Sequence, residues 1–106
     1  MTDRLDKLLS LFRECPTDSF LLFAIAKEYE HLNDKEKANY YYQHLFAMDA
    51  DYVGLYFHWG KLLEEMDEQE KALEIYERGI EVSAKLNDIH AEKELRAAKY
   101  NCEMLS

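Results

Sequence analysis

Residues 53–86 read VGLYFHWGKLLEEMDEQEKALEIYERGIEVSAKL, and the 34 residues before them, 19–52, read SFLLFAIAKEYEHLNDKEKANYYYQHLFAMDADY. Aligning the two stretches without a gap gives nine identical pairs. They are Leu21/Leu55, Phe23/Phe57, Lys27/Lys61, Glu30/Glu64, Glu36/Glu70, Lys37/Lys71, Ala38/Ala72, Tyr42/Tyr76 and Ala50/Ala84. The sequence therefore contains an internal repeat, and a period of 34 residues is typical of solenoids built from helix pairs.

Apolar residues recur at steps of three and four along almost the whole chain, which predicts amphipathic helices. In the first repeat this stripe includes Phe20, Ile25 and Tyr29, and short polar breaks such as Asn33-Asp34 separate one stripe from the next. No stretch alternates with a period of two, and three Gly and one Pro leave few turn residues for a β fold. We expect an all-α chain of about six helices.

The turn between the two helices of each repeat lacks a terminating Gly. Asn33 and Asp67 stand there instead, and both residue types tolerate the left-handed conformation or cap the next helix. Glu36 and Glu70 follow three residues later, at the spacing of a capping box.

The composition excludes several classes of function. The chain has 106 residues, 22 acidic and 13 basic, and its net charge of −9 repels nucleic acid and anionic lipid. No stretch approaches the roughly 18–20 apolar residues that span a bilayer, and the first residues lack the apolar region of a secretion signal. Cys15 and Cys102 are far apart and form no metal-binding or disulfide pattern. We expect a cytoplasmic protein with no membrane or nucleic-acid partner.

The repeated residues resemble the tetratricopeptide repeat. That pattern has bulky residues at positions 4 and 7, a small one at 8, an aromatic at 11, Ala at 20 and an aromatic at 24. Residues 19–52 supply Leu22, Ile25, Ala26, Tyr29, Ala38 and Tyr42, and residues 53–86 supply Tyr56, Trp59, Gly60, Leu63, Ala72 and Tyr76. Small residues at positions 8 and 20 let the two helices cross closely. Ala50 and Ala84 depart from the pattern, because Pro usually ends the repeat.

The resemblance implies a right-handed superhelix of antiparallel helix pairs and a single domain over residues 1–106. Residues 1–16 would form an N-terminal half-repeat, where Leu8, Leu11 and Pro16 match the second helix and final Pro of a truncated repeat. Residues 19–52 and 53–86 would be the full repeats. Residues 87–106 break the pattern and would form a C-terminal capping helix with one polar face.

The family resemblance also implies a binding surface, because the first helices of successive repeats line a concave groove in this family. The matching residues here are Phe20, Phe23, Lys27, Glu30 and His31, then Phe57, His58, Lys61 and Glu64. A repeated row of aromatic, cation and anion suits a peptide with apolar anchors and alternating charge. Alternatively, terminal helices cover these Phe side chains and the row only extends the core.

We therefore expect a non-enzymatic adaptor or scaffold that binds another protein in its groove and needs no cofactor. One alternative is a structural module that self-associates through the groove or a terminal helix. A second is a small metal-dependent enzyme using Glu28, Glu30 and His31, although the chain holds a single Glu-x-x-His unit where di-iron bundles use two. The acidic stretch 64–81 is attributed to solubility or to a basic partner.

Overall fold

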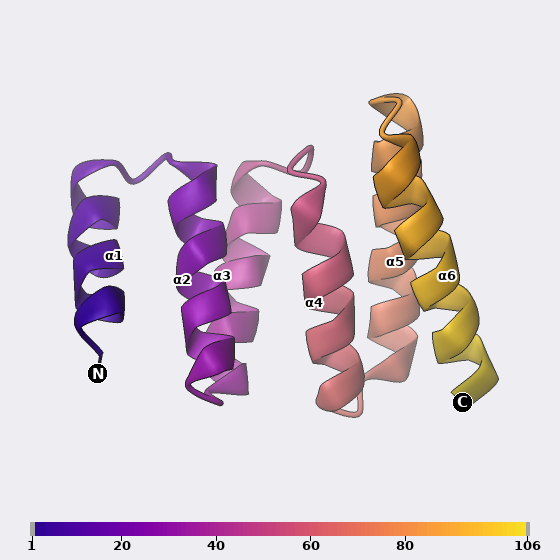
Figure 1. Cartoon of the computed structure of the whole chain (residues 1–106), viewed down its shortest axis with the longest axis horizontal. Coiled ribbons are helices and arrows are strands. Elements are labelled where there is room, and N and C mark those ends of the chain that lie inside the picture. The colour runs from indigo at the N-terminus through magenta and orange to yellow at the C-terminus, as the bar shows by residue number, and fades with distance from the viewer. Residues whose placement is uncertain (1, 106) are drawn as a thin grey trace. The chain divides into compact units, whose positions relative to one another are not determined.

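The computed structural model describes residues 2–105 and contains six α-helices in this range (Figure 1). No strand occurs among these residues, so the all-α prediction and the predicted number of helices are confirmed. None of the helices in the described part of the chain is long and apolar enough to cross a membrane. The helices are α1 (Asp3–Glu14), α2 (Ser19–His31), α3 (Lys35–Met48), α4 (Gly54–Glu65), α5 (Gln69–Lys85) and α6 (Ile89–Leu105).

The contacts between these helices group them into two compact units. Unit 1 is Met1–Tyr52 and holds α1 to α3, and unit 2 is Val53–Ser106 and holds α4 to α6. The division falls between Tyr52 and Val53, where the 34-residue period also places the start of its second copy. Each unit therefore contains one hairpin of antiparallel helices and one additional helix.

The turns after α2, α4 and α5 share one conformation. Asn33, Asp67 and Asn87 each have a positive φ, of 60°, 60° and 59°. In the first of these turns the amide of Asp34 donates to the carbonyl of Tyr29, five residues back, at 2.9 Å. This left-handed residue followed by a long backward bond is the Schellman ending of a helix, and the prediction for Asn33 and Asp67 is confirmed.

The predicted capping boxes are wrong by one residue. The side chain of Asp34, rather than Asn33, caps α3 by accepting a hydrogen bond from the Lys37 amide at 3.2 Å. Glu36 is then the second residue of the helix and lies one position short of the capping-box site. At α5 the N-cap is Glu68, whose side chain makes no capping bond. The reason is that Asn33 and Asp67 are already used to end the preceding helix.

The core of unit 1 is formed by the residues that the repeat pattern places at its small and bulky positions. These buried residues come from α2 and α3, which pack against each other. They are Leu22, Ile25, Ala26, Tyr29, Ala38, Tyr42 and Leu45. From α1 the buried residue is Leu5, whereas Leu11, which the sequence suggested as a packing position, is 49% exposed. Opposite the turn, the Ser19 hydroxyl donates to Asp49 at 2.7 Å and joins the start of α2 to the end of α3.

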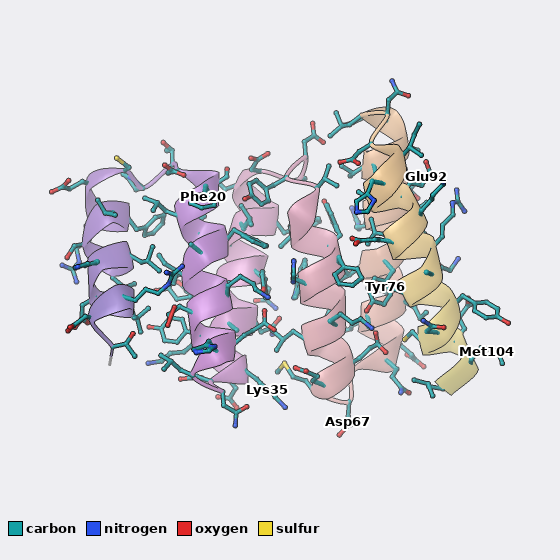
Figure 2. All side chains as sticks on the ribbon, viewed as in Figure 1. Phe20, Lys35, Asp67, Tyr76, Glu92 and Met104 are labelled. Carbon is teal, nitrogen blue, oxygen red and sulfur yellow. The ribbon has the colours of Figure 1, made fainter. Side chains whose placement is uncertain are left out.

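Unit 2 depends on two close approaches between helices. Gly60 of α4 lies so near the ring of Tyr76 in α5 that a Cβ atom there would be 2.2 Å from ring carbon Cε1. Figure 2 labels this tyrosine on α5. Gly79 of α5 lies against Tyr56, whose Cβ would be 2.5 Å from a Cβ at position 79. The prediction that position 8 of the repeat must be small is therefore confirmed at Gly60, and the structure adds Gly79 as a second tight point.

Gly79→Ala and Gly60→Ala should each destabilise unit 2 by about 1–3 kcal/mol, because the added methyl group would overlap a buried tyrosine. Gly79→Ala should cost more, since the Cβ of Tyr56 is fixed to the backbone while the Tyr76 ring can tilt. The check is the free energy of unfolding in urea. The matched control is Gly54→Ala at the exposed first residue of α4, where alanine should be neutral or stabilising. Equal unfolding midpoints for Gly79→Ala and Gly54→Ala would contradict the close approach.

Candidate functional site

The nine residues predicted to bind a partner lie on two helices, one in each unit. α2 carries Phe20, Phe23, Lys27, Glu30 and His31, and α4 carries Phe57, His58, Lys61 and Glu64. On α2, Phe20 and His31 are exposed while the other three are partly covered. On α4, Lys61 is exposed and the other three are partly covered.

Unit 1 has a pocket of about 500 Å³ on the face that α2 shares with the start of α1. Four of the predicted residues line it, together with three others, and the full lining is Arg4, Phe20, Phe23, Ala24, Lys27, Glu28 and His31. Phe20, near the N-terminal end of α2 in Figure 2, has 64% of its surface exposed. A large exposed aromatic side chain beside a hollow is the usual form of an interaction site on a small protein.

No pattern in the sequence indicated that Arg4 and Glu28 belong to this pocket. The Arg4 Nε atom donates to Glu28 Oε2 at 2.9 Å, joining α1 to α2. Glu28 is a nearly buried carboxylate, and such a group needs a charged partner. Arg4 lies in the half-repeat, which the 34-residue alignment leaves outside both full copies.

The charged side chains around the pocket are covered unequally. The side chains of Glu28 and Glu30 are 9% and 20% exposed, whereas those of Arg4 and Lys27 are 73% and 41% exposed. Lys27 Nζ lies 3.8 Å from Glu30. The acids are thus held inside and the cations outside, so an incoming molecule meets aromatic and positively charged groups first.

Phe23 has a different position from Phe20. Its ring lies 6.3 Å from the ring of Tyr42 in α3 and 5.4 Å from that of Tyr52, which follows α3. Phe23 is therefore partly packed within unit 1 while still lining the pocket. These two tyrosines supply part of the packing around Phe23.

Glu30 and Glu64 have a structural role that the sequence analysis missed. The hydroxyl of the fully buried Tyr42 donates to Glu30, and that of the fully buried Tyr76 donates to Glu64. Burial raises the pKa of both tyrosines, and the bonded carboxylates raise it further. The sequence did hold a signal for this role. Both copies of the repeat have a Glu followed twelve residues later by a Tyr.

The matching face of α4 is closed by its own side chains. Lys61 Nζ lies 5.8 Å from the centre of the Phe57 ring, and the His58 ring meets the same ring edge-on at 5.6 Å. Beneath them Cys102 of α6 is buried, and burial together with the Glu64 carboxylate raises the pKa of its thiol. The α4 face therefore offers a cation held over an aromatic ring.

The residues of the metal hypothesis do not converge. Glu28 pairs with Arg4, Glu30 accepts from Tyr42, and His31 is exposed at the end of α2. Within residues 2–105 no group of three His, Cys, Asp or Glu side chains is placed to hold a metal ion.

Tyr42→Phe and Tyr76→Phe should each lower the free energy of unfolding by about 1–2 kcal/mol, because each removes a hydrogen bond to a carboxylate and keeps the ring. The control is Tyr40→Phe, which removes a hydroxyl from a tyrosine that is 60% exposed and should change stability little. Chemical denaturation at neutral pH measures all three. A loss no greater than that of the control would show that the buried Tyr–Glu pairs contribute nothing.

The raised pKa of Tyr42 also predicts a loss of stability in alkali. A tyrosine in the unfolded chain ionises near pH 10, while the buried one stays protonated, so the unfolded state is favoured as pH rises above about 10. Below that pH the contribution is constant. The fall in unfolding free energy between about pH 10 and 11.5 should be shallower in Tyr42→Phe, by up to about 1.4 kcal/mol per pH unit. Parallel curves for the variant and the wild type would contradict the assignment.

Comparison with known proteins gives the family. No protein-family model matches the chain, and no curated protein matches it either. Among solved structures, the crystal structure of a tetratricopeptide repeat domain protein from Salinibacter ruber is 35% identical over 84% of this chain and 99% of that one, with a TM-score of 0.80. A solution NMR structure of a tetratricopeptide repeat domain protein from the same organism is also 35% identical, over 86% and 92%, with a TM-score of 0.83.

A more distant likeness shows the shared fold alone. The type III secretion translocator chaperone SycD of Yersinia enterocolitica is 16% identical over 96% of this chain and 71% of its own, with a TM-score of 0.87. The helix pairs, the tight small positions and the 35% identity to a complete repeat domain agree with one another. This chain belongs to the tetratricopeptide repeat family, and it is a helical-repeat module of the protein-interaction type.

Proposed function

We propose that this chain is a non-enzymatic adaptor that binds a segment of another protein through the exposed face of α2. The observation that carries the proposal is the pocket of about 500 Å³ around Phe20. The pocket is lined by apolar and charged side chains, which suit recognition of a peptide. We expect the chain to do this without a cofactor.

The pocket has the properties of an anchor site. Phe20 and Phe23 form its apolar wall together with the small side chain of Ala24. A cavity of this volume accepts one or two apolar side chains of a partner, and burial of such anchors supplies most of the energy in protein interfaces. Phe20 itself gains a covered environment when the segment binds.

The charges around the pocket favour an acidic segment beside the apolar anchor. Arg4 uses its Nε atom for Glu28, which leaves the other guanidinium N–H groups to meet a second carboxylate. Lys27 is the second outward cation at this pocket. Contacts between exposed charges act mainly on selectivity and on the rate of association, so the apolar anchor supplies the affinity.

Within unit 2, the equivalent face of α4 presents polar groups, since Lys61 and His58 lie against the Phe57 ring. The distant fold relative SycD is a type III secretion translocator chaperone. We extend that kind of role, and not its particular client, to this chain.

A peptide-display selection tests the proposal directly. Random peptides displayed on phage are selected on the wild-type chain, and the affinities of enriched peptides are measured by calorimetry. We expect the enriched peptides to share an aromatic or large aliphatic residue with acidic neighbours. Phe20→Glu should weaken binding by more than about tenfold, since it removes the anchor wall and adds repulsion. Lys27→Glu should weaken the binding of acidic peptides in particular.

The matched control for Phe20→Glu is Ile89→Glu at the first residue of α6. Ile89 is 67% exposed, close to the value for Phe20, and lies in the other unit. Both variants should keep the far-ultraviolet circular dichroism of the wild type. Peptides that bind wild type, Phe20→Glu and Ile89→Glu equally well would place the interaction elsewhere on the molecule.

A further inference from the structure

The first and last helices of the described chain, α1 and α6, have no partner helix from their own repeat. A shift of 34 residues carries α1 (Asp3–Glu14) onto residues 37–48 inside α3, the second helix of its pair. The same shift carries α4, a first helix, onto residues 88–99, all but the first of which lie in α6. α1 is thus a second helix without a first, and α6 is a first helix without a second. This assignment underlies the proposed half-repeat at 1–16 and the terminal helix at 87–106.

The face of α1 that would meet a first helix is uncovered. Arg4, Leu8 and Leu11 occupy the positions that are fully buried in α3, namely those of Ala38, Tyr42 and Leu45. In α1 the Arg4 side chain is 73% exposed and Leu11 is 49% exposed. Two hollows of about 420 and 410 Å³ lie on this face, lined by Arg4, Lys7 and Leu8 and by Asp6, Lys7, Ser10 and Leu11.

The face of α6 that would meet a second helix is uncovered as well. Glu94 and Ala97 stand where α4 has the buried Gly60 and Leu63, and both are exposed in α6. Tyr100, one turn further along, is 62% exposed, and Met104 near the end of the helix in Figure 2 is exposed too. Exposed apolar side chains of the described chain are concentrated on this helix and the residues just before it.

The antiparallel pairing seen inside unit 1 sets the register of these two faces. In the α2–α3 hairpin, Tyr29 stacks on Tyr41 with ring centres 5.5 Å apart, which puts Leu32 level with Ala38. Two repeats after Leu32 comes Tyr100, and one repeat before Ala38 comes Arg4. A guanidinium would therefore meet a tyrosine ring, an attractive cation–π pair.

The next turn is complementary in size and charge. In unit 2 Gly60 lies against Tyr76, and the corresponding pair is Glu94 against Leu8. The smaller Leu8 leaves room for the stem of Glu94, and the Glu94 carboxylate then lies beside the cation of Lys7. Glu94 is larger than the glycine at this position of α4. In the proposed contact, the small size of Leu8 and the positive charge of Lys7 compensate for it.

We propose that copies of this chain associate head to tail, with α6 of one copy packing antiparallel on α1 of the next and completing a helix pair between them. Such an interface uses two different surfaces of the chain, and contacts of this kind build either a closed ring or an open chain of copies. Arg4 keeps its Nε bond to Glu28 and contributes its remaining N–H groups to the interface. Arg4 also lines the peptide site around Phe20, so the two sites share this side chain, while the rest of that site's lining lies on α2.

Sedimentation equilibrium over a concentration series measures the association. The mass of the wild type should rise above the 12.6 kDa of one chain as concentration increases. The double variant Lys7→Glu, Leu11→Lys blocks the α1 face by repulsion from Glu94 and Lys93. The double variant Glu94→Lys, Tyr100→Lys blocks the α6 face by repulsion from Lys7 and Arg4. Each alone should remain at 12.6 kDa.

Mixing the two double variants is the decisive step. The first keeps an intact α6 and the second an intact α1, so the mixture should form a one-to-one complex of twice the single-chain mass. Tyr40→Lys, at a tyrosine of similar exposure on α3, is the control and should associate like the wild type. Circular dichroism verifies that each variant is folded, and Lys7→Glu alone replaces the first double variant if α1 unwinds.

Three results would overturn the proposal. A wild type that stays at 12.6 kDa at all concentrations would show that no association occurs. Continued association of the Lys7→Glu, Leu11→Lys variant by itself would indicate a symmetric contact between two α6 helices. A mixture of the two double variants that stays at the single-chain mass would show that α6 does not dock on α1.

Discussion

The close crossing of the two helices in a hairpin is the constraint on which the other features depend. At Gly60 the missing side chain lets the ring of Tyr76 lie against the α4 backbone. The ring is then fully buried, and its hydroxyl needs an acceptor because an unpaired buried polar group is costly. Glu64, one turn after Gly60, accepts that bond and also lies against Cys102 of α6. The small size of Gly60 thus determines where the Tyr76 ring lies, and that ring in turn determines the role of the Glu64 carboxylate, which also contacts α6.

The same constraint shapes the surface that we propose to be functional. In unit 1 the acids next to the pocket have partners within the unit. Glu30 accepts a hydrogen bond from Tyr42, and Glu28 forms an ion pair with Arg4. Their cationic neighbours remain outside. A chain with a net charge of −9 therefore presents a positive and aromatic face at this one pocket. The sign of a local surface follows from which member of each ion pair is buried, and the total charge does not reveal it.

The two ends of the chain show what happens to a repeat without its partner helix. α1 keeps Leu8 and Leu11 at positions that are buried in a complete pair, but it has Arg4 where the pair has alanine. α6 has Glu94 at the small position and Tyr100 at a bulky one. Large and charged residues at the tight positions would prevent packing against an ordinary repeat helix. In the interface that we propose, Leu8 is smaller than the tyrosine at its position in the repeats, and Arg4 meets the Tyr100 ring as a cation–π pair.

The sequence by itself determined the repeat, the six helices and the tight positions, because the 34-residue spacing and the helical periodicity are local properties of the chain. It also identified four of the residues that line the pocket. It could not show that Glu30 and Glu64 are acceptors for buried tyrosines, or that Arg4 joins the pocket. Those facts depend on which side chains meet across helices, and burial and pairing between helices are decided only when the tertiary structure forms.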